Sequence, residues 1–87
     1  LVIRWQKLTY KKGYDPAAVQ AVLTAKIAAI SLGPDIALER ALLLAIAKLQ
    51  VDGILSVPAD ALASPIVDTQ PAPGYTIKIL PSGVIYL

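Results

Sequence analysis

The sequence predicts an α+β domain, in which two alanine- and leucine-rich helices pack on one face of a small, mainly antiparallel sheet. The first residues alternate between apolar and polar, which is typical of a strand. The middle of the chain holds two long alanine-rich runs, and its end has the pattern of a β-hairpin. The predicted element order is β-α-α-β-β-β. Because the chain has 87 residues, residues 1–87 are expected to form a single domain.

The N-terminal segment alternates apolar Ile3 and Trp5 with charged Arg4, as a half-buried strand does. The alternation changes phase before Leu8. Either both faces of this strand are covered, or a bulge near Lys7 re-aims it.

A helical hairpin is predicted over about residues 16–50. Asp15 and Pro16 form a strong helix start, because aspartate accepts from the first-turn amides and proline has its φ preset. The first helix is expected over Ala17–Leu32, ended by Gly33 in a left-handed conformation.

The second helix is expected to begin at Leu38 or Glu39 and end at Gln50, before the break at Asp52-Gly53. A strand over Ile54–Val57 follows. Since a helical hairpin returns the chain to the end where it began, this strand should run antiparallel to the first.

A proline-rich loop is predicted over residues 58–74, with one helical turn over Ala59–Ala63. It exceeds the usual loop length, so it is either functional or partly structured. Ile66 and Val67 in this loop either dock on a neighbouring surface or pack into the domain's own core.

The C-terminal residues 75–87 are predicted to form a hairpin. Tyr75–Ile79 alternates as a strand does, Pro81-Ser82-Gly83 supplies turn residues, and Val84–Leu87 is the return strand.

The composition excludes most catalytic chemistry. The chain has no histidine and no cysteine, so Ser-His-Asp triads, Cys-His pairs and thiolate zinc sites cannot form within it. Its carboxylates mostly sit where capping or turn formation explains them, and its glycines are isolated rather than grouped in a phosphate-binding loop. We expect no enzymatic activity, cofactor or metal.

The chain is unusually apolar: 56% of its residues are hydrophobic and 16% are charged, against about 45–50% and 25% in ordinary globular proteins. This excess predicts surface that contacts other protein chains, including self-association. The longest uncharged stretch of the helical region, Ala41–Ala47, is far shorter than the ~20 residues that span a membrane. The absence of methionine suggests a piece of a longer polypeptide.

Basic residues near the N-terminus interleave with aromatic ones, as in grooves that bind single-stranded nucleic acid. The basic residues are Arg4, Lys7, Lys11 and Lys12, and the aromatic ones are Trp5, Tyr10 and Tyr14. The net charge of only +2 favours a solvated strand edge instead. Trp5 and Tyr86 are expected in the core or at an interface.

Three segments resemble the C-terminal domain of baseplate J-like proteins, which are wedge components of contractile phage tails. They are Gly13-Tyr14-Asp15-Pro16-Ala17-Ala18-Val19, Leu32-Gly33-Pro34-Asp35-Ile36 with the helix that ends at Val51-Asp52-Gly53-Ile54, and Ser64-Pro65-Ile66-Val67-Asp68 with Pro73-Gly74. The chain departs from the family pattern at Gln50–Gly53 and has an apparent insertion at Pro58–Ala63.

The resemblance implies a non-enzymatic structural role in a virion or phage-tail-like particle, assembled in the bacterial cytoplasm by packing against other subunits. It carries over only fold-making positions: Gly13, Asp15, Pro16, Gly33, Gly53, Pro73 and Gly74. The candidate interface residues are Trp5, Tyr10, Ile66, Val67 and Tyr86. Two alternatives are a nucleic-acid-binding module that uses the basic strand and a domain of a bacterial secretion or envelope assembly.

Overall fold

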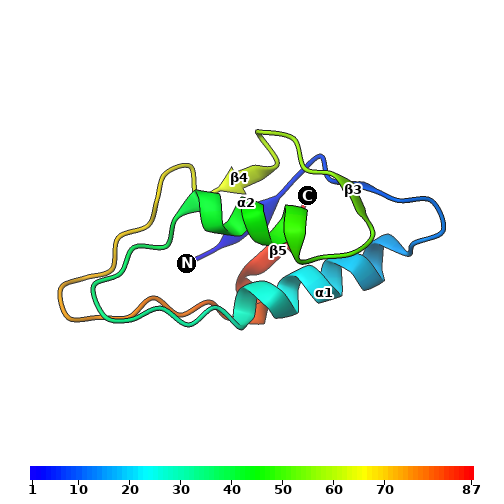
Figure 1. The fold of residues 1–87 in the computed structure, drawn as a ribbon. Coiled ribbons are helices and arrows are strands. Elements are labelled where there is room, and N and C mark those ends of the chain that lie inside the picture. Colours follow the sequence, from blue (N-terminus) through cyan, green and yellow to red (C-terminus); the bar gives the residue numbers. More distant parts are fainter.

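The computed structural model describes residues 1–87 and confirms an α+β domain with two helices (Figure 1). The elements are β1 (Ile3–Trp5), β2 (Thr9–Tyr10), α1 (Pro16–Ala28), α2 (Arg40–Leu49), β3 (Ile54–Ser56), β4 (Leu62–Ser64), a 3₁₀ turn η1 (Pro81–Gly83) and β5 (Val84–Tyr86). This order roughly matches the predicted one.

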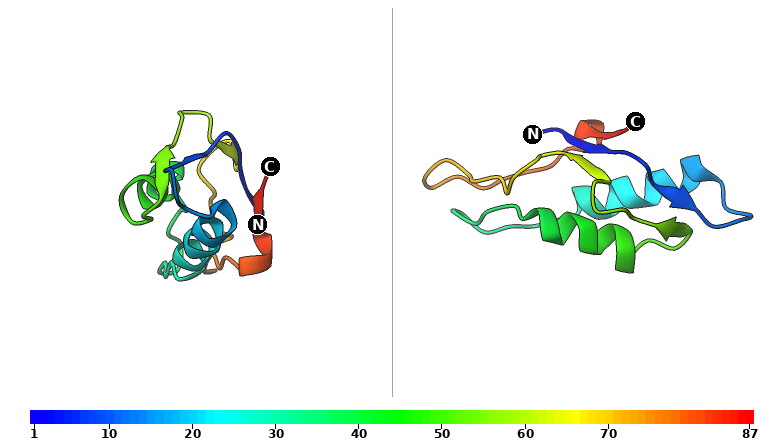
Figure 2. Two further views of the ribbon diagram at one scale, coloured as in Figure 1. Left: turned by 90° about the vertical axis from the view of Figure 1, so that its right-hand side faces the viewer. Right: turned by 90° about the horizontal axis from the view of Figure 1, so that it is seen from above.

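The strands form two small sheets rather than one. One sheet has the order β4-β1-β5, and the other pairs β2 with β3. In the first sheet β1 runs antiparallel to β4 and parallel to β5. Both helices lie on one side of this sheet (Figure 2, left), so Ile3 and Trp5 point into the core while Arg4 faces solvent.

A kink at Lys7 divides the N-terminal segment into β1 and β2, close to the predicted bulge. Lys7 has a φ of 57°. The Gln6 amide donates to the Ala61 carbonyl over 2.8 Å, and the Lys7 ammonium contacts the Asp60 carboxylate at 2.5 Å. The change of phase follows from the two pairings, because β1 lies between β4 and β5 whereas β2 pairs with β3 in a separate sheet.

The antiparallel pairing predicted for the second strand is confirmed between β2 and β3, where Thr9 lies opposite Ser56. Their hydroxyl groups are 2.6 Å apart.

Helix α1 begins as predicted. The Asp15 carboxylate accepts from the Ala17 amide over 3.2 Å, and Val19, Leu23 and Ile27 face the core at helical spacing. The predicted end was wrong: the helix stops at Ala28, and Gly33 does not take a positive φ.

The physical reason for the early end is burial. Ile30 and Leu32 pack against the core together with Ile77, and the chain therefore leaves the helix to run beside the C-terminal segment. Asp35, not Gly33, adopts the left-handed conformation, with a φ of 62°.

Helix α2 lies within its predicted range and buries Leu43, Ile46 and Ala47. The N-cap residue Glu39 makes no side-chain capping hydrogen bond. Instead, the carboxylate of distant Asp68 accepts from the Arg40 amide over 2.9 Å.

The proline-rich loop is partly structured, because it contains β4. The helical turn predicted over Ala59–Ala63 was wrong. Ala61 and Leu62 are buried, and Leu62 pairs with Trp5 in the sheet, so an extended conformation places more apolar surface in the core.

The predicted C-terminal hairpin over residues 75–87 was also wrong. Residues 75–80 form no strand, and β5 pairs parallel with β1. Pairing with β1 buries Val84 and lets the Leu87 amide donate to the Trp5 carbonyl over 2.8 Å. A local hairpin could not offer this buried partner.

The molecule is elongated, with extents of 45 × 21 × 20 Å. One end is formed by residues 30–39 and 65–78, which project together beyond the helices and sheets (Figures 1 and 2). We call these two segments the arm. The core of 14 apolar residues lies between the helices and the β4-β1-β5 sheet.

Candidate functional site

No group of three or more Asp or Glu side chains is placed to hold a metal ion. Neither helix combines the length and apolar character needed to cross a bilayer.

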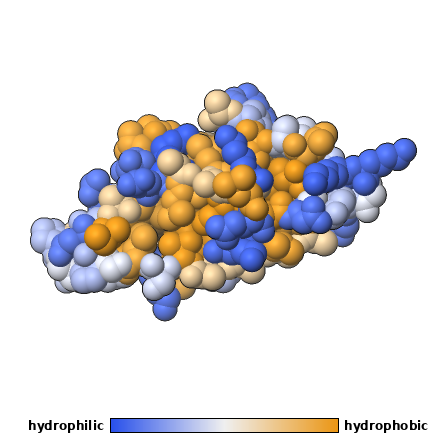
Figure 3. Space-filling model, in the orientation of Figure 1, coloured by the Kyte–Doolittle hydropathy of each residue, from blue (hydrophilic) through white to orange (hydrophobic).

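The arm carries several large apolar side chains that are exposed to solvent. Ile66 is 80% exposed, Val67 68%, Tyr75 69% and Ile36 51%. The alternative in which Ile66 and Val67 pack into the domain's own core was therefore wrong. On the face shown in Figure 3, apolar surface covers the middle of the molecule and reaches the root of the arm. Four of the 14 exposed large apolar residues lie on the arm, and the other ten are spread over the rest of the molecule. Within the arm, Ile66 and Val67 are adjacent, and contiguous exposed apolar groups are typical of contact surfaces.

Hydrogen bonds tie the two segments of the arm together. Leu38 and Thr69 exchange two backbone hydrogen bonds of 2.9 Å each. Nearer the tip, the Asp35 amide donates to the Tyr75 carbonyl over 3.1 Å, and the Asp35 carboxylate accepts from the Gly74 amide over 2.6 Å. The exposed side chains are thus presented by a cross-linked element rather than by a free loop.

Arg40 connects the arm to the body of the domain. Its guanidinium donates to the Leu62 carbonyl over 3.0 Å and also to the carbonyl of Pro65. Together with the cap that Asp68 gives to α2, this fixes the root of the arm beside Ile66 and Val67.

Sequence reasoning missed the side chains that hold the arm: Asp35, Arg40 and Asp68. Pro34-Asp35 was a detectable turn signal. Nothing local marks Arg40 and Asp68, because each bonds a residue more than twenty positions away.

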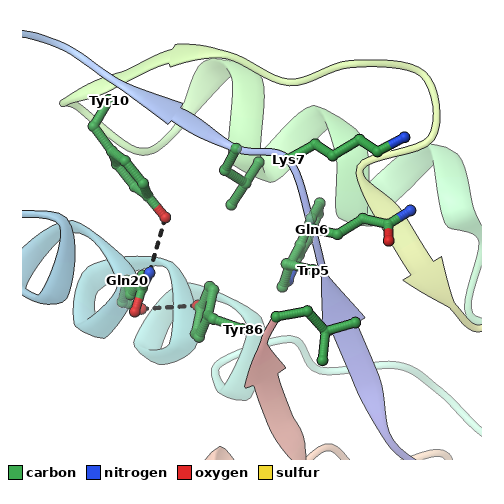
Figure 4. A pocket seen from close by; sticks show the side chains of 8 residues that line it. Trp5, Gln6, Lys7, Tyr10, Gln20 and Tyr86 are labelled. Carbon is green, nitrogen blue, oxygen red and sulfur yellow. Dashed lines mark hydrogen bonds between the residues drawn. The ribbon is translucent and has the colours of Figure 1, made fainter.

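Three of the predicted interface residues lie together elsewhere, at the junction of β1, β2, α1 and β5 (Figure 4). Trp5 is fully buried, which confirms the core among the two locations expected for it and corrects its place among the candidate interface residues. Tyr10 and Tyr86 are partly buried. The Tyr10 hydroxyl accepts from the Gln20 side-chain amide over 2.9 Å, and the Tyr86 hydroxyl donates to the Gln20 carbonyl over 2.8 Å.

Partial burial raises the pKa of the Tyr86 hydroxyl above its ordinary value, because the charged phenolate would lose solvation. Its partner Thr24, at 2.9 Å, opposes this shift only in part. Tyr86 therefore serves as a neutral hydrogen-bonding group that ties β5 to α1.

Two of the four basic N-terminal residues form ion pairs. Lys7 contacts Asp60 at 2.5 Å, and Lys11 contacts Asp52 at 3.4 Å. Trp5 offers no face for base stacking, because it is buried. The geometry thus favours the solvated edge over the nucleic-acid alternative.

Most of the predicted fold-making positions lie where the backbone turns. Asp15 and Pro16 start α1, and Pro73 precedes the turn at Gly74. Gly13, Gly53 and Gly74 all have positive φ; Gly33 is the exception.

No family model matches this chain, and neither a curated protein nor a solved structure matches it.

Proposed function

We propose that this domain is a non-enzymatic structural part of a larger protein assembly, of the contractile-tail baseplate kind, and that it acts by packing against neighbouring subunits. The observation that carries the proposal is the arm. It combines a projecting shape, internal cross-links and exposed apolar side chains. The resemblance of three sequence segments to the baseplate J-like C-terminal domain supplies the kind of assembly and the localisation in a virion or tail-like particle.

The physical argument rests on the cost of leaving the arm in water. Each large apolar side chain gains about 1.5–3 kcal/mol when it is fully buried rather than exposed. Ile66 and Val67 are adjacent and largely exposed, and the arm's hydrogen bonds reduce the conformational entropy that would be lost when a partner covers them. A neighbouring protein surface is a suitable partner, because apolar contact needs no charge complementarity.

Sedimentation velocity of the isolated domain tests the proposal. We expect concentration-dependent association at micromolar concentrations, because the domain should cover its arm with a second copy when its native neighbours are absent. The double variant Ile66→Ser/Val67→Ser should stay monomeric.

The matched control is Leu49→Ser/Leu55→Ser, which removes two exposed apolar side chains outside the arm, 83% and 66% exposed in the wild-type domain. It should associate like the wild type. A wild-type domain that remains monomeric throughout, or equal loss of association in both double variants, would contradict the proposal.

A further inference from the structure

The chain that returns from the tip of the arm has the burial pattern of a strand but is paired with none. Thr76 and Lys78 are exposed. Ile77 is partly buried and Ile79 is buried, so the side chains alternate between solvent and the core as they do in a strand. The backbone of Thr76–Ile79 takes part in none of the backbone–backbone hydrogen bonds. Accessible unpaired backbone groups along such a segment are the feature to which a further strand can be added.

A groove of about 300 Å³ is lined by the two segments of the arm. Residues 76–78 line it from one segment, and Ile30, Ser31 and Leu32 line it from the other. Figure 1 shows these two stretches of chain running side by side. Ser31 and Leu32 also make no backbone–backbone hydrogen bond, so the groove is not closed by sheet pairing on either side.

The backbone groups of Ile77 face the segment on the other side of the groove. The Tyr75 carbonyl accepts from the Asp35 amide over 3.1 Å, so it points toward that segment. In an extended chain the N–H and C=O of one residue point to the same side, and those of every second residue share that side. The N–H and C=O of Ile77 therefore point the same way as the Tyr75 carbonyl.

Lys78 determines the charge that fits the groove. It is the one charged side chain among the lining residues, it is exposed, and neither ion pair of the domain includes it. Side chains that lie opposite each other on paired strands share a face, where opposite charges stabilise the pair and like charges destabilise it. An acidic side chain therefore fits opposite Lys78, whereas the same segment of a second copy would offer another lysine.

We propose that this groove binds an extended segment of another protein, which adds as a strand beside Thr76–Lys78 and alternates apolar with acidic side chains. The added strand exchanges backbone hydrogen bonds with Ile77 and pairs an acidic side chain with Lys78. The inference rests on the proposed assembly function, because a neighbouring subunit supplies the segment. The contact is separate from Ile66 and Val67, which do not line the groove.

The test is an NMR titration of the backbone amides of the whole chain with the blocked peptide Val-Glu-Val-Glu-Val. The wild type and the Ile66→Ser/Val67→Ser variant are both titrated, so that self-association through the arm does not interfere. We expect a saturable downfield shift of the Ile77 amide proton, because it becomes hydrogen-bonded. The same peptide with N-methylated amides should not bind, since it keeps the side chains but cannot donate backbone hydrogen bonds.

Charge reversal tests the role given to Lys78. Lys78→Glu should bind the acidic peptide several-fold more weakly, and it should prefer the peptide Val-Lys-Val-Lys-Val. The matched control is Lys12→Glu, which reverses the charge of an exposed lysine outside the groove. It should bind the acidic peptide as the wild type does.

Three results would overturn the proposal: an Ile77 amide that does not shift, equal binding of the N-methylated peptide, or equal effects of the two lysine variants. Protection of the Ile77 amide that rises with protein concentration alone in Ile66→Ser/Val67→Ser would also overturn it, because a second copy would then occupy the groove. If no peptide binds while the wild type still self-associates, only the strand addition fails. If the peptide binds to a wild type that stays monomeric, only the self-association fails.

Discussion

Asp52 joins two turns that are distant in the sequence. Its carboxylate accepts from the Tyr14 hydroxyl over 2.7 Å and from the Lys11 ammonium over 3.4 Å. The hydrogen bond from Tyr14 is the main reason that the pKa of Asp52 lies below its ordinary value, and the same bond raises the pKa of Tyr14. The Lys7 contact likewise lowers the pKa of Asp60.

These shifts predict a loss of stability in acid. A carboxylate whose pKa is lower in the folded state binds fewer protons than in the unfolded state, so its contribution is present above its unfolded pKa and is lost as the pH falls through its folded pKa. We expect the urea midpoint to fall as the pH is lowered below about 4. Asp52→Asn should flatten this dependence.

The stability that Tyr14 contributes depends on pH in the opposite direction, and the change falls at high pH. Its raised pKa means that the contribution of Tyr14 to stability is present below the unfolded tyrosine pKa and is lost as the pH rises through the folded one.

The acid prediction has its own contradicting outcome. If the urea midpoint of Asp52→Asn falls in acid as steeply as that of the wild type, Asp52 does not have the role given to it.

Gly53 is constrained in two ways at the same turn. Its φ is +96°, and a Cβ at this position would lie 2.5 Å from Cδ2 of Tyr14 and 2.8 Å from Cγ2 of Val19. Gly53→Ala should therefore lower the free energy of unfolding by at least about 1–3 kcal/mol from backbone strain alone.

Gly13→Ala is the matched control, because Gly13 has a φ of +88° but nothing within 4 Å of a Cβ. Chemical denaturation should show a clearly smaller loss for Gly13→Ala. Equal losses would mean that the contact with Tyr14 and Val19 relaxes without cost.

At the scale of elements, local signals predicted the starts of structures better than their ends. Asp15-Pro16 contains its own cap, so the start of α1 was readable from adjacent residues. The end of α1 at Ala28 was not, because it is set by Ile30 and Leu32 packing beside Ile77.

The strand pairing, like the end of α1, depends on contacts between residues that are distant in the sequence. The alternation in Ile3–Trp5 correctly predicted a strand with one buried face, but no local pattern could show that β5 would pair parallel with it. Ile66 and Val67 were singled out from the length and the prolines of their loop, and the structure shows that both are exposed. For Trp5 the sequence left core and interface both open, because an aromatic residue in a strand has the same pattern in either place; the structure buries it in the core.

Asp68 caps α2 from the arm, and this predicts a coupling between the two elements. Asp68→Ala removes the acceptor of the Arg40 amide, and losing a helix cap costs about 0.5–2 kcal/mol. Thermal or urea unfolding should show this loss, and Asp68→Asn, which keeps an acceptor oxygen, should retain most of the stability. If Asn is as destabilising as Ala, the hydrogen bond to Arg40 is not the source of the effect.

At the scale of the whole molecule, the body and the arm differ in whether their large apolar side chains are buried or exposed. Thirteen of the 14 core residues lie outside the arm, and Leu38 at its root is the other one. The arm extends an elongated molecule of 45 Å and exposes Ile66, Val67 and Tyr75 to solvent. The absence of histidine and cysteine removed much catalytic chemistry at the outset. The contact role is thus argued from where apolar side chains are placed.

Hydrogen exchange measured against protein concentration tests this contact role most directly. As the concentration rises into the range where the domain associates, peptides covering residues 66–76 should gain protection. Peptides covering Val19–Ile27, which face the domain's own core, should not change. Unchanged protection of the arm at every concentration, or protection gained only outside it, would contradict the claim that the arm is the contact surface.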